Sequence, residues 1–182
     1  MLNSKYPLAV PTWTDEEVNA GIDVLKSMNC TMGSVTDDFE NKLANYFKVK
    51  EAVFCNSGSS ANLLALSAFK EFLKIKKDKR NEIIVPMMSW STTYYPVIQM
   101  GFNIKFIDIN INTLNIDIDL IENCINQNTV GILGVTILGN PLDTNIKKLC
   151  HNNNLYLIED NCESMGAIDK DKDIAGTNGL MG

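Results

Sequence analysis

Three short polar segments follow apolar runs that have the length of buried strands. The first, residues 56–62, has the sequence NSGSSAN, in which Gly58 permits a tight turn and Ser59 and Ser60 add hydroxyl groups. Backbone N–H groups at a helix start, together with such hydroxyls, can hold a phosphate. Serines that only cap the helix explain the spacing equally well. The segment is neither a P-loop nor a G-x-G-x-x-G loop, and Asn62 stands where a G-x-S-x-G nucleophile elbow needs glycine.

The second segment, residues 88–96, contains Trp90. An indole at the end of a strand could present its flat face to a bound ring, since aromatic stacking adds about 0.5–1.5 kcal/mol beyond burial. For this residue alone, a tryptophan packed in the core is the simpler interpretation.

The third segment, residues 159–164, places Glu159, Asp160 and Glu163 after an apolar strand. Charges there are costly unless they are exposed or paired. A carboxylate at this point could bind a cationic ring nitrogen or a metal. Metal is the weaker hypothesis, because His151 is the only histidine and is expected at an exposed helix end. Paired carboxylates for glycoside hydrolysis are a further alternative, although no sugar-binding aromatic residues cluster beside them.

Together the three segments offer a phosphate site, a ring-stacking aromatic residue and an acid for a ring nitrogen. Pyridoxal phosphate (PLP) needs all three, because an acid beside its pyridine nitrogen keeps the ring protonated and able to accept electrons. The same chemistry needs a lysine that forms a Schiff base, normally beyond the acidic strand. In parallel α/β sheets, such ligand-binding loops lie at the carboxyl ends of the strands.

The apolar pattern predicts the elements that must position these segments. Helices are expected at residues 14–28, 35–47, 61–77, 92–100, 117–126 and 143–153, and strands at residues 52–55, 83–85, 104–107, 130–135 and 155–158. A capping box of Thr14 and Glu17 begins the first helix, and the charged stretch at residues 74–82 is expected on the surface. Alternating strands and helices indicate βαβ crossovers, so the expected fold class is a three-layer α/β/α domain.

Composition narrows the function classes. The chain has 182 residues, a formal net charge of −6 and a pI near 4.8. One domain is expected, and the acidic balance argues against a nucleic-acid or anionic-membrane partner. No apolar run approaches the roughly 18 residues of a membrane span, and the N-terminus lacks a signal-peptide pattern. Five widely spaced cysteines without a C-x-x-C pair indicate reduced thiols. These features predict a cytoplasmic protein.

The chain resembles the N-terminal half of the DegT/DnrJ/EryC1/StrS family, PLP-dependent sugar aminotransferases of the aspartate aminotransferase fold (fold type I). Matching stretches are residues 31–40, 56–62, 90–93, 138–141 and 159–167. The likeness in SGSSANLLALSA, SWSTTYYP and EDNCESMGA is strongest to the CDP-4-keto-6-deoxyglucose 3-dehydratase branch.

The resemblance implies a role for each candidate residue. Gly58 and Ser59, with Ser60, would hold the phosphate of PLP or of its amino form, pyridoxamine phosphate (PMP). Trp90 would stack on the pyridine ring and Asp160 would pair with its nitrogen. Glu163 would lie near the hydroxyl group of the cofactor.

The chain stops in a Gly-rich turn at residues 175–182, an unusual end for a natural domain, so the sequence is expected to be truncated. The resemblance implies that the Schiff-base lysine, or the histidine that replaces it in the dehydratase branch, lies beyond Gly182. Residues 1–182 would then be an incomplete PLP-binding large domain without the small C-terminal domain. No catalytic residue is expected within the chain, which alone would be inactive.

By resemblance, the expected activity is amino transfer to a nucleotide-linked 4-keto-6-deoxy sugar in surface polysaccharide or lipopolysaccharide biosynthesis, with a donor such as glutamate. The alternative is PLP- or PMP-dependent 3-dehydration of a CDP-linked 4-keto-6-deoxy sugar. A non-catalytic PLP-binding module and a hydrolase that uses Asp160 and Glu163 remain further alternatives. A homodimer is expected, because active sites of the family are completed across a two-fold interface.

Overall fold

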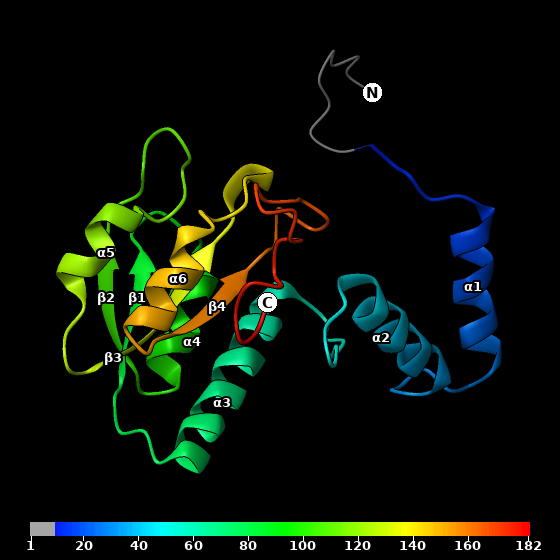
Figure 1. Ribbon diagram of the computed structural model, residues 1–182. Coiled ribbons are helices and arrows are strands. Elements are labelled where there is room, and N and C mark those ends of the chain that lie inside the picture. Colours follow the sequence, from blue (N-terminus) through cyan, green and yellow to red (C-terminus); the bar gives the residue numbers. More distant parts are fainter. Residues whose placement is uncertain (1–9) are drawn as a thin grey trace.

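The computed structural model describes residues 10–182. The first nine residues, on which part of the signal-peptide prediction rests, lie outside the described part. Its centre is a sheet of parallel strands (Figure 1). The strands are β1 (Glu82–Pro86), β2 (Asn103–Ile107), β3 (Thr129–Val135) and β4 (Tyr156–Asp160). They lie in the order β2-β1-β3-β4. Each was expected from its apolar run.

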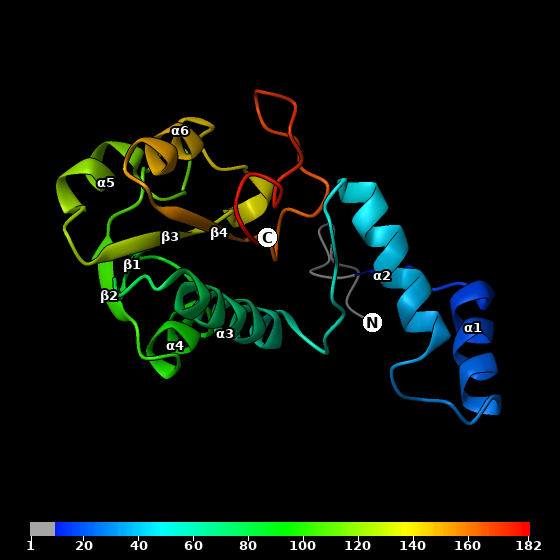
Figure 2. The same ribbon diagram turned by 60° about the horizontal axis from the view of Figure 1, so that its bottom comes forward.

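Helices cover both faces of this sheet (Figure 2). The helices are α1 (Asp15–Lys26), α2 (Ser34–Phe47), α3 (Gly58–Lys76), α4 (Ser91–Gln99), α5 (Ile118–Cys124) and α6 (Asn145–Asn152). Helices α3 and α4 pack on one face, and α5 and α6 on the other. The three-layer α/β/α prediction is therefore confirmed.

Side chains alternate between the two cores because successive residues of a strand point to opposite faces. In β1, Ile83 and Val85 pack with Leu66 and Phe69 of α3, whereas Ile84 joins the cluster beneath α5 and α6. Every residue of β3 is buried, as a central parallel strand requires.

The N-terminal helices α1 and α2 project away from the sheet in both views (Figures 1 and 2). The predicted capping box is confirmed: the Thr14 N–H donates to Glu17 Oε2 at 2.6 Å, and the Glu16 N–H donates to Thr14 Oγ1 at 3.2 Å. Neither helix contains a buried residue. No helix within residues 10–182 is both long and apolar enough to cross a membrane.

The strand expected at residues 52–55 is wrong. This segment has no strand partner in the described part of the chain, and Val53 and Phe54 are more than half exposed. Instead, the Phe54 N–H donates to Glu40 Oε1 at 2.7 Å, and the Phe54 ring meets that of Phe39 edge-on at 5.6 Å between centroids. The segment is apolar enough for a strand, but a strand also needs a neighbour with free backbone groups.

At the amino end of the sheet, the Arg80 side chain bonds to three separate segments of the chain, at Asp78, Thr129 and Asn154. Its guanidinium pairs with Asp78 at 2.7 Å and donates to the carbonyls of Thr129 at 3.1 Å and Asn154 at 2.9 Å. Hydrogen bonds from Arg80 lower the pKa of Asp78. The charged stretch was expected on the surface, yet the side chains of Arg80 and Asp78 are only 22% and 17% exposed.

Candidate functional site

The carboxyl end of β4 brings together residues from three elements around Asp160. The carboxylate is buried, with 8% of the residue exposed. Asn62 of α3 donates from Nδ2 to Asp160 Oδ2 at 2.8 Å, and Thr93 of α4 donates from Oγ1 to the same oxygen at 3.1 Å. The Cys162 N–H donates to Oδ1 at 3.2 Å. Both helix starts therefore converge on this carboxylate.

The charge of Asp160 lacks a cationic partner within the described residues, where none of the ion pairs includes it. All three of its hydrogen-bond donors are neutral. Hydrogen bonds from neutral groups offset only part of the hydration that a buried carboxylate loses. The geometry therefore suits a ligand that carries a positive charge.

The start of α3 presents free donors beside this carboxylate. Ser57 caps the helix: its Oγ accepts from the Ser60 N–H at 3.2 Å. The capping interpretation thus accounts for Ser57 and for the amide of Ser60. Gly58 and Ser59 are exposed, and their N–H groups are among the first of a helix of 19 residues, which have no partner within the helix. A Cβ added to Gly58 would meet no atom within 4 Å, so the helix end faces open space suited to an anion.

Trp90 stands immediately before α4 and is 74% exposed. The simpler interpretation, a tryptophan packed in the core, is therefore wrong. Its position is set by the strand-to-helix turn, in which the Thr93 N–H donates to the Trp90 carbonyl at 3.0 Å. Trp90 thus lies three residues from a group that touches Asp160, with its indole open to a ligand.

Glu163 lies apart from these contacts. Its Oε2 accepts from the Leu138 N–H at 2.7 Å, which ties the loop after β4 to the loop after β3. Leu138 has a left-handed backbone, with φ of 55°, that is unusual for a branched residue. Within the described residues, no hydrogen bond joins Glu163 to Asp160.

Cys162 is also a poor candidate for a nucleophile. Partial burial, followed by the charge of Asp160, raises the pKa of its thiol to about 11. The thiolate that would react is therefore scarce at neutral pH.

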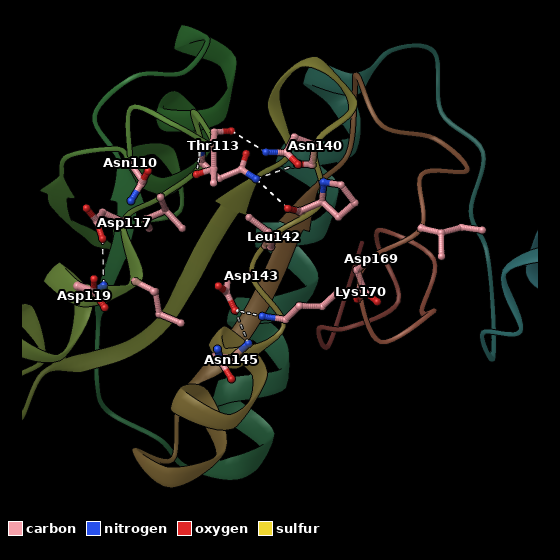
Figure 3. A pocket seen from close by; sticks show the side chains of 15 residues that line it. Asn110, Thr113, Asp117, Asp119, Asn140, Leu142, Asp143, Asn145, Asp169 and Lys170 are labelled. Carbon is pink, nitrogen blue, oxygen red and sulfur yellow. Dashed lines mark hydrogen bonds and ion pairs between the residues drawn. The ribbon is translucent and has the colours of Figure 1, made fainter.

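A separate shallow cavity of about 510 Å³ lies between the loops around residues 110–119, 137–145 and 168–170 (Figure 3). Several of its polar side chains bond to one another or to the surrounding backbone. Asn115 donates to the carbonyls of Asn140 and Pro141, both at 2.9 Å, and Lys170 pairs with Asp143 at 3.0 Å. None of the candidate residues lines this cavity. Within residues 10–182, no group of three His, Cys, Asp or Glu residues is placed to hold a metal ion.

Sequence reasoning missed the roles of Asn62 and Thr93. A signal for Asn62 was available, because it occupies the same face of its helix as Leu66, Phe69 and Leu73, which are buried. A polar residue on an apolar stripe indicates a buried hydrogen-bond partner. Thr93 gave no comparable signal.

Comparison with protein families identifies the chain. Residues 11–181 match the model of the DegT/DnrJ/EryC1/StrS aminotransferase family. The chain belongs to this family. It is 48% identical over 178 residues to a GDP-4-keto-6-deoxy-D-mannose 3-dehydratase of Escherichia coli O55:H7. The aligned residues make up 97% of this chain and 46% of that relative. The chain therefore spans about half the length of the curated relative.

Solved structures of the family share the fold. An Escherichia coli GDP-4-keto-6-deoxy-D-mannose-3-dehydratase with bound hydrated PLP superposes with a TM-score of 0.90 and 48% identity, over 98% of this chain and 46% of that one. PseC of Helicobacter pylori, an aminotransferase of pseudoaminic acid biosynthesis, gives a TM-score of 0.83 at 29% identity, over 93% of this chain and 45% of that one. The predicted family and fold type are confirmed.

Proposed function

We propose that this chain binds PLP or PMP as the cofactor-binding part of an enzyme that acts on a nucleotide-linked 4-keto-6-deoxy sugar. The observation that carries the proposal is the buried Asp160 carboxylate, which has only neutral donors around it at the carboxyl end of the sheet. A protonated pyridine nitrogen supplies the positive charge that this carboxylate lacks, together with one further hydrogen-bond donor.

The surrounding donor set fits the rest of the cofactor. The free N–H groups of Gly58 and Ser59, with the hydroxyls of Ser59 and Ser60, would hold the phosphate at the positive end of α3. The exposed indole of Trp90 would stack on the ring. Glu163, which accepts from the Leu138 N–H, would lie near the cofactor's hydroxyl group.

When bound, the cofactor supplies a protonated pyridine ring that accepts electrons from the substrate. The residues of this chain have supporting tasks. Asp160 holds the proton on the ring nitrogen, Trp90 covers one ring face and keeps water from it, and the start of α3 anchors the phosphate. Residues 1–182 would form an incomplete PLP-binding large domain, with the group that moves protons at the substrate supplied from outside it.

For the reaction we favour 3-dehydration of a GDP-linked sugar, because the relative at 48% identity carries that activity in its name. Amino transfer, the usual activity of the family, is the second candidate and is supported by the likeness to PseC. A homodimer and a cytoplasmic location belong to the same proposal. The five cysteines are free, which fits a reducing compartment.

Cofactor binding is tested with PMP rather than PLP, because the aldehyde of PLP reacts with surface lysines and PMP cannot. The 182-residue chain is titrated with PMP by calorimetry, alongside Asp160→Ala and Trp90→Ala. Binding that both substitutions weaken supports the proposal. Equal binding by all three proteins would show that the site assignment is wrong.

The reaction is tested with the full-length protein, a GDP-linked 4-keto-6-deoxy sugar and glutamate. Mass spectrometry distinguishes the candidates, since dehydration removes the 3-hydroxyl and amino transfer replaces the 4-keto oxygen with an amine. An aminated product that retains its 3-hydroxyl would overturn dehydration.

A further inference from the structure

We propose that Asn62 is a positioning residue that fixes the Asp160 carboxylate for a protonated ring nitrogen. This inference rests on the proposed function and adds to it a residue that does not itself touch the cofactor. Its basis is the 2.8 Å hydrogen bond from Asn62 Nδ2 to Asp160 Oδ2, which joins residues 98 positions apart in the chain.

The position of Asn62 on α3 makes a polar side chain costly unless it has a partner. Leu66, Phe69 and Leu73 follow it at helical spacing and are between 0% and 4% exposed. An amide at the start of this apolar stripe loses hydration, and the bond to Asp160 compensates for that loss. A leucine would continue the stripe, so packing alone does not require an asparagine here.

Counting acceptor positions shows what this contact leaves open. A carboxylate has about four lone-pair positions. Asn62 and Thr93 occupy two on Oδ2, and the Cys162 N–H occupies one on Oδ1. About one position therefore remains for a ring N–H, and its direction is fixed because both oxygens are already held.

The two side-chain donors approach Oδ2 from different helices, α3 and α4. Without Asn62, the carboxylate keeps Thr93 and the Cys162 N–H but has more freedom to rotate about its terminal torsion, which is broad for aspartate. The cost of ordering it would then be met during cofactor binding. Asn62 is neutral, so it orients the carboxylate without cancelling the charge that attracts the ring.

The test compares PMP binding by the 182-residue chain with binding by Asn62→Leu, Asn62→Ala and a matched control, Asn152→Leu. Asn152 is exposed on α6. We expect Asn62→Leu to weaken PMP binding by about tenfold to a hundredfold, the size of one hydrogen bond to a charged group. The shorter Asn62→Ala removes the donor without the bulk of leucine and should weaken binding by a similar factor. Asn152→Leu should bind as the unsubstituted chain does.

A second readout separates positioning from a purely structural role. Nitrogen-15 NMR of PMP labelled at the ring reports the pH at which the bound pyridine nitrogen loses its proton. If Asn62 positions Asp160, this pH falls toward that of free PMP in Asn62→Leu. A weaker affinity with an unchanged nitrogen titration would overturn the inference. Should Asn62→Leu fail to fold, Asn62→Ala decides by the same two measurements.

Failure of this inference is distinguishable from failure of the proposed function. If Asn62→Leu and Asn62→Ala bind PMP normally while Asp160→Ala does not, the cofactor site stands and the role of Asn62 is refuted. If Asp160→Ala binds PMP as well as the unsubstituted chain does, both fail.

Discussion

At the amino end of the sheet, Arg80 and Asp78 neutralise one another, and the remaining guanidinium donors are taken by the carbonyls of Thr129 and Asn154. At the carboxyl end, Asp160 is more deeply buried and has only neutral donors. In the folded chain, the charges at the amino end are therefore paired, whereas the charge of Asp160 at the carboxyl end has no charged partner among the described residues. This difference indicates where stability resides and where a ligand is needed.

The two ends also differ in how their carboxylates respond to pH. Hydrogen bonds from Arg80 lower the pKa of Asp78, so its contribution to stability is lost as the pH falls. Near the other end, burial raises the pKa of Glu159, although the N–H groups of Gly176, Asn178 and Gly179 partly oppose this shift. Glu159 therefore acts in the opposite direction to Asp78.

The largest expected effect is the loss of cofactor affinity in Asp160→Asn. The substitution removes the charge but keeps the shape, and breaking a buried ion pair costs about 3–5 kcal/mol, so PMP binding should weaken at least a hundredfold. Calorimetric titration measures this change. Asp38→Asn, at an exposed position of α2, is the matched control. A loss of PMP affinity below fivefold would show that the charge of Asp160 is not required for the ligand, and the proposed difference between the two ends of the sheet would be wrong.

Arg80→Met tests the amino end. It leaves Asp78 unpaired and two carbonyls without their donor, so we expect the free energy of unfolding to fall by about 2 kcal/mol. Urea denaturation measures this loss, with the exposed Lys79→Ala as control. PMP affinity should not change. A stable variant that binds PMP poorly would contradict the division of roles.

Trp90→Ala should weaken PMP binding by about tenfold, because the stacking surface is lost. Stability should hardly change, since the indole is 74% exposed. The exposed Trp13→Ala provides the comparison for removing an indole elsewhere. Equal PMP affinities for the two variants would show that Trp90 does not stack on the ring.

The raised pKa of Glu159 predicts a falling contribution to stability as the pH rises. The folded chain binds this proton more tightly than the unfolded chain, so the contribution is complete below 4.5, the ordinary pKa of glutamate, and is lost above it. The slope should stay below about 1.4 kcal/mol per pH unit. In urea denaturation from pH 4 to 7, the free energy of unfolding should fall less, or rise more, with pH for Glu159→Gln than for the exposed Glu122→Gln. Parallel profiles would contradict this assignment.

The smallest effects are expected for Gly58→Ala, and they have opposite signs. Alanine favours the helix, and its Cβ meets no protein atom, so stability should rise by about 0.5 kcal/mol. The same Cβ would crowd a phosphate, so PMP affinity should fall. Thermal denaturation and calorimetry check the two parts. A rise in both quantities would place the phosphate elsewhere.

The sequence predicted the layers because the strands and helices have local periodicity. It failed at residues 52–55, where an apolar run meets the composition of a strand but has no pairing partner in the described chain. Pairing is a non-local property, so composition cannot decide it.

The candidate site was predictable only in part. Asp160 was found from its place at the end of a strand, and Gly58 and Ser59 from their place at the start of a helix, whereas the contacts of Asp160 with Asn62 and Thr93 span 98 and 67 residues. Trp90 alone suggested a core residue, and only its combination with the other segments suggested a ligand. The buried contacts of Arg80 could not be predicted, because this residue belongs to a charged stretch whose composition is typical of a protein surface.

The most direct test measures whether Asp160 selects for a positive charge on the ring. The 182-residue chain and Asp160→Asn are each titrated with PMP and with its benzene analogue, in which carbon replaces the ring nitrogen. We predict that the unsubstituted chain prefers PMP by about fiftyfold or more, as for a desolvated charge pair, and that Asp160→Asn shows little preference. Equal binding of both compounds by the unsubstituted chain would contradict the account.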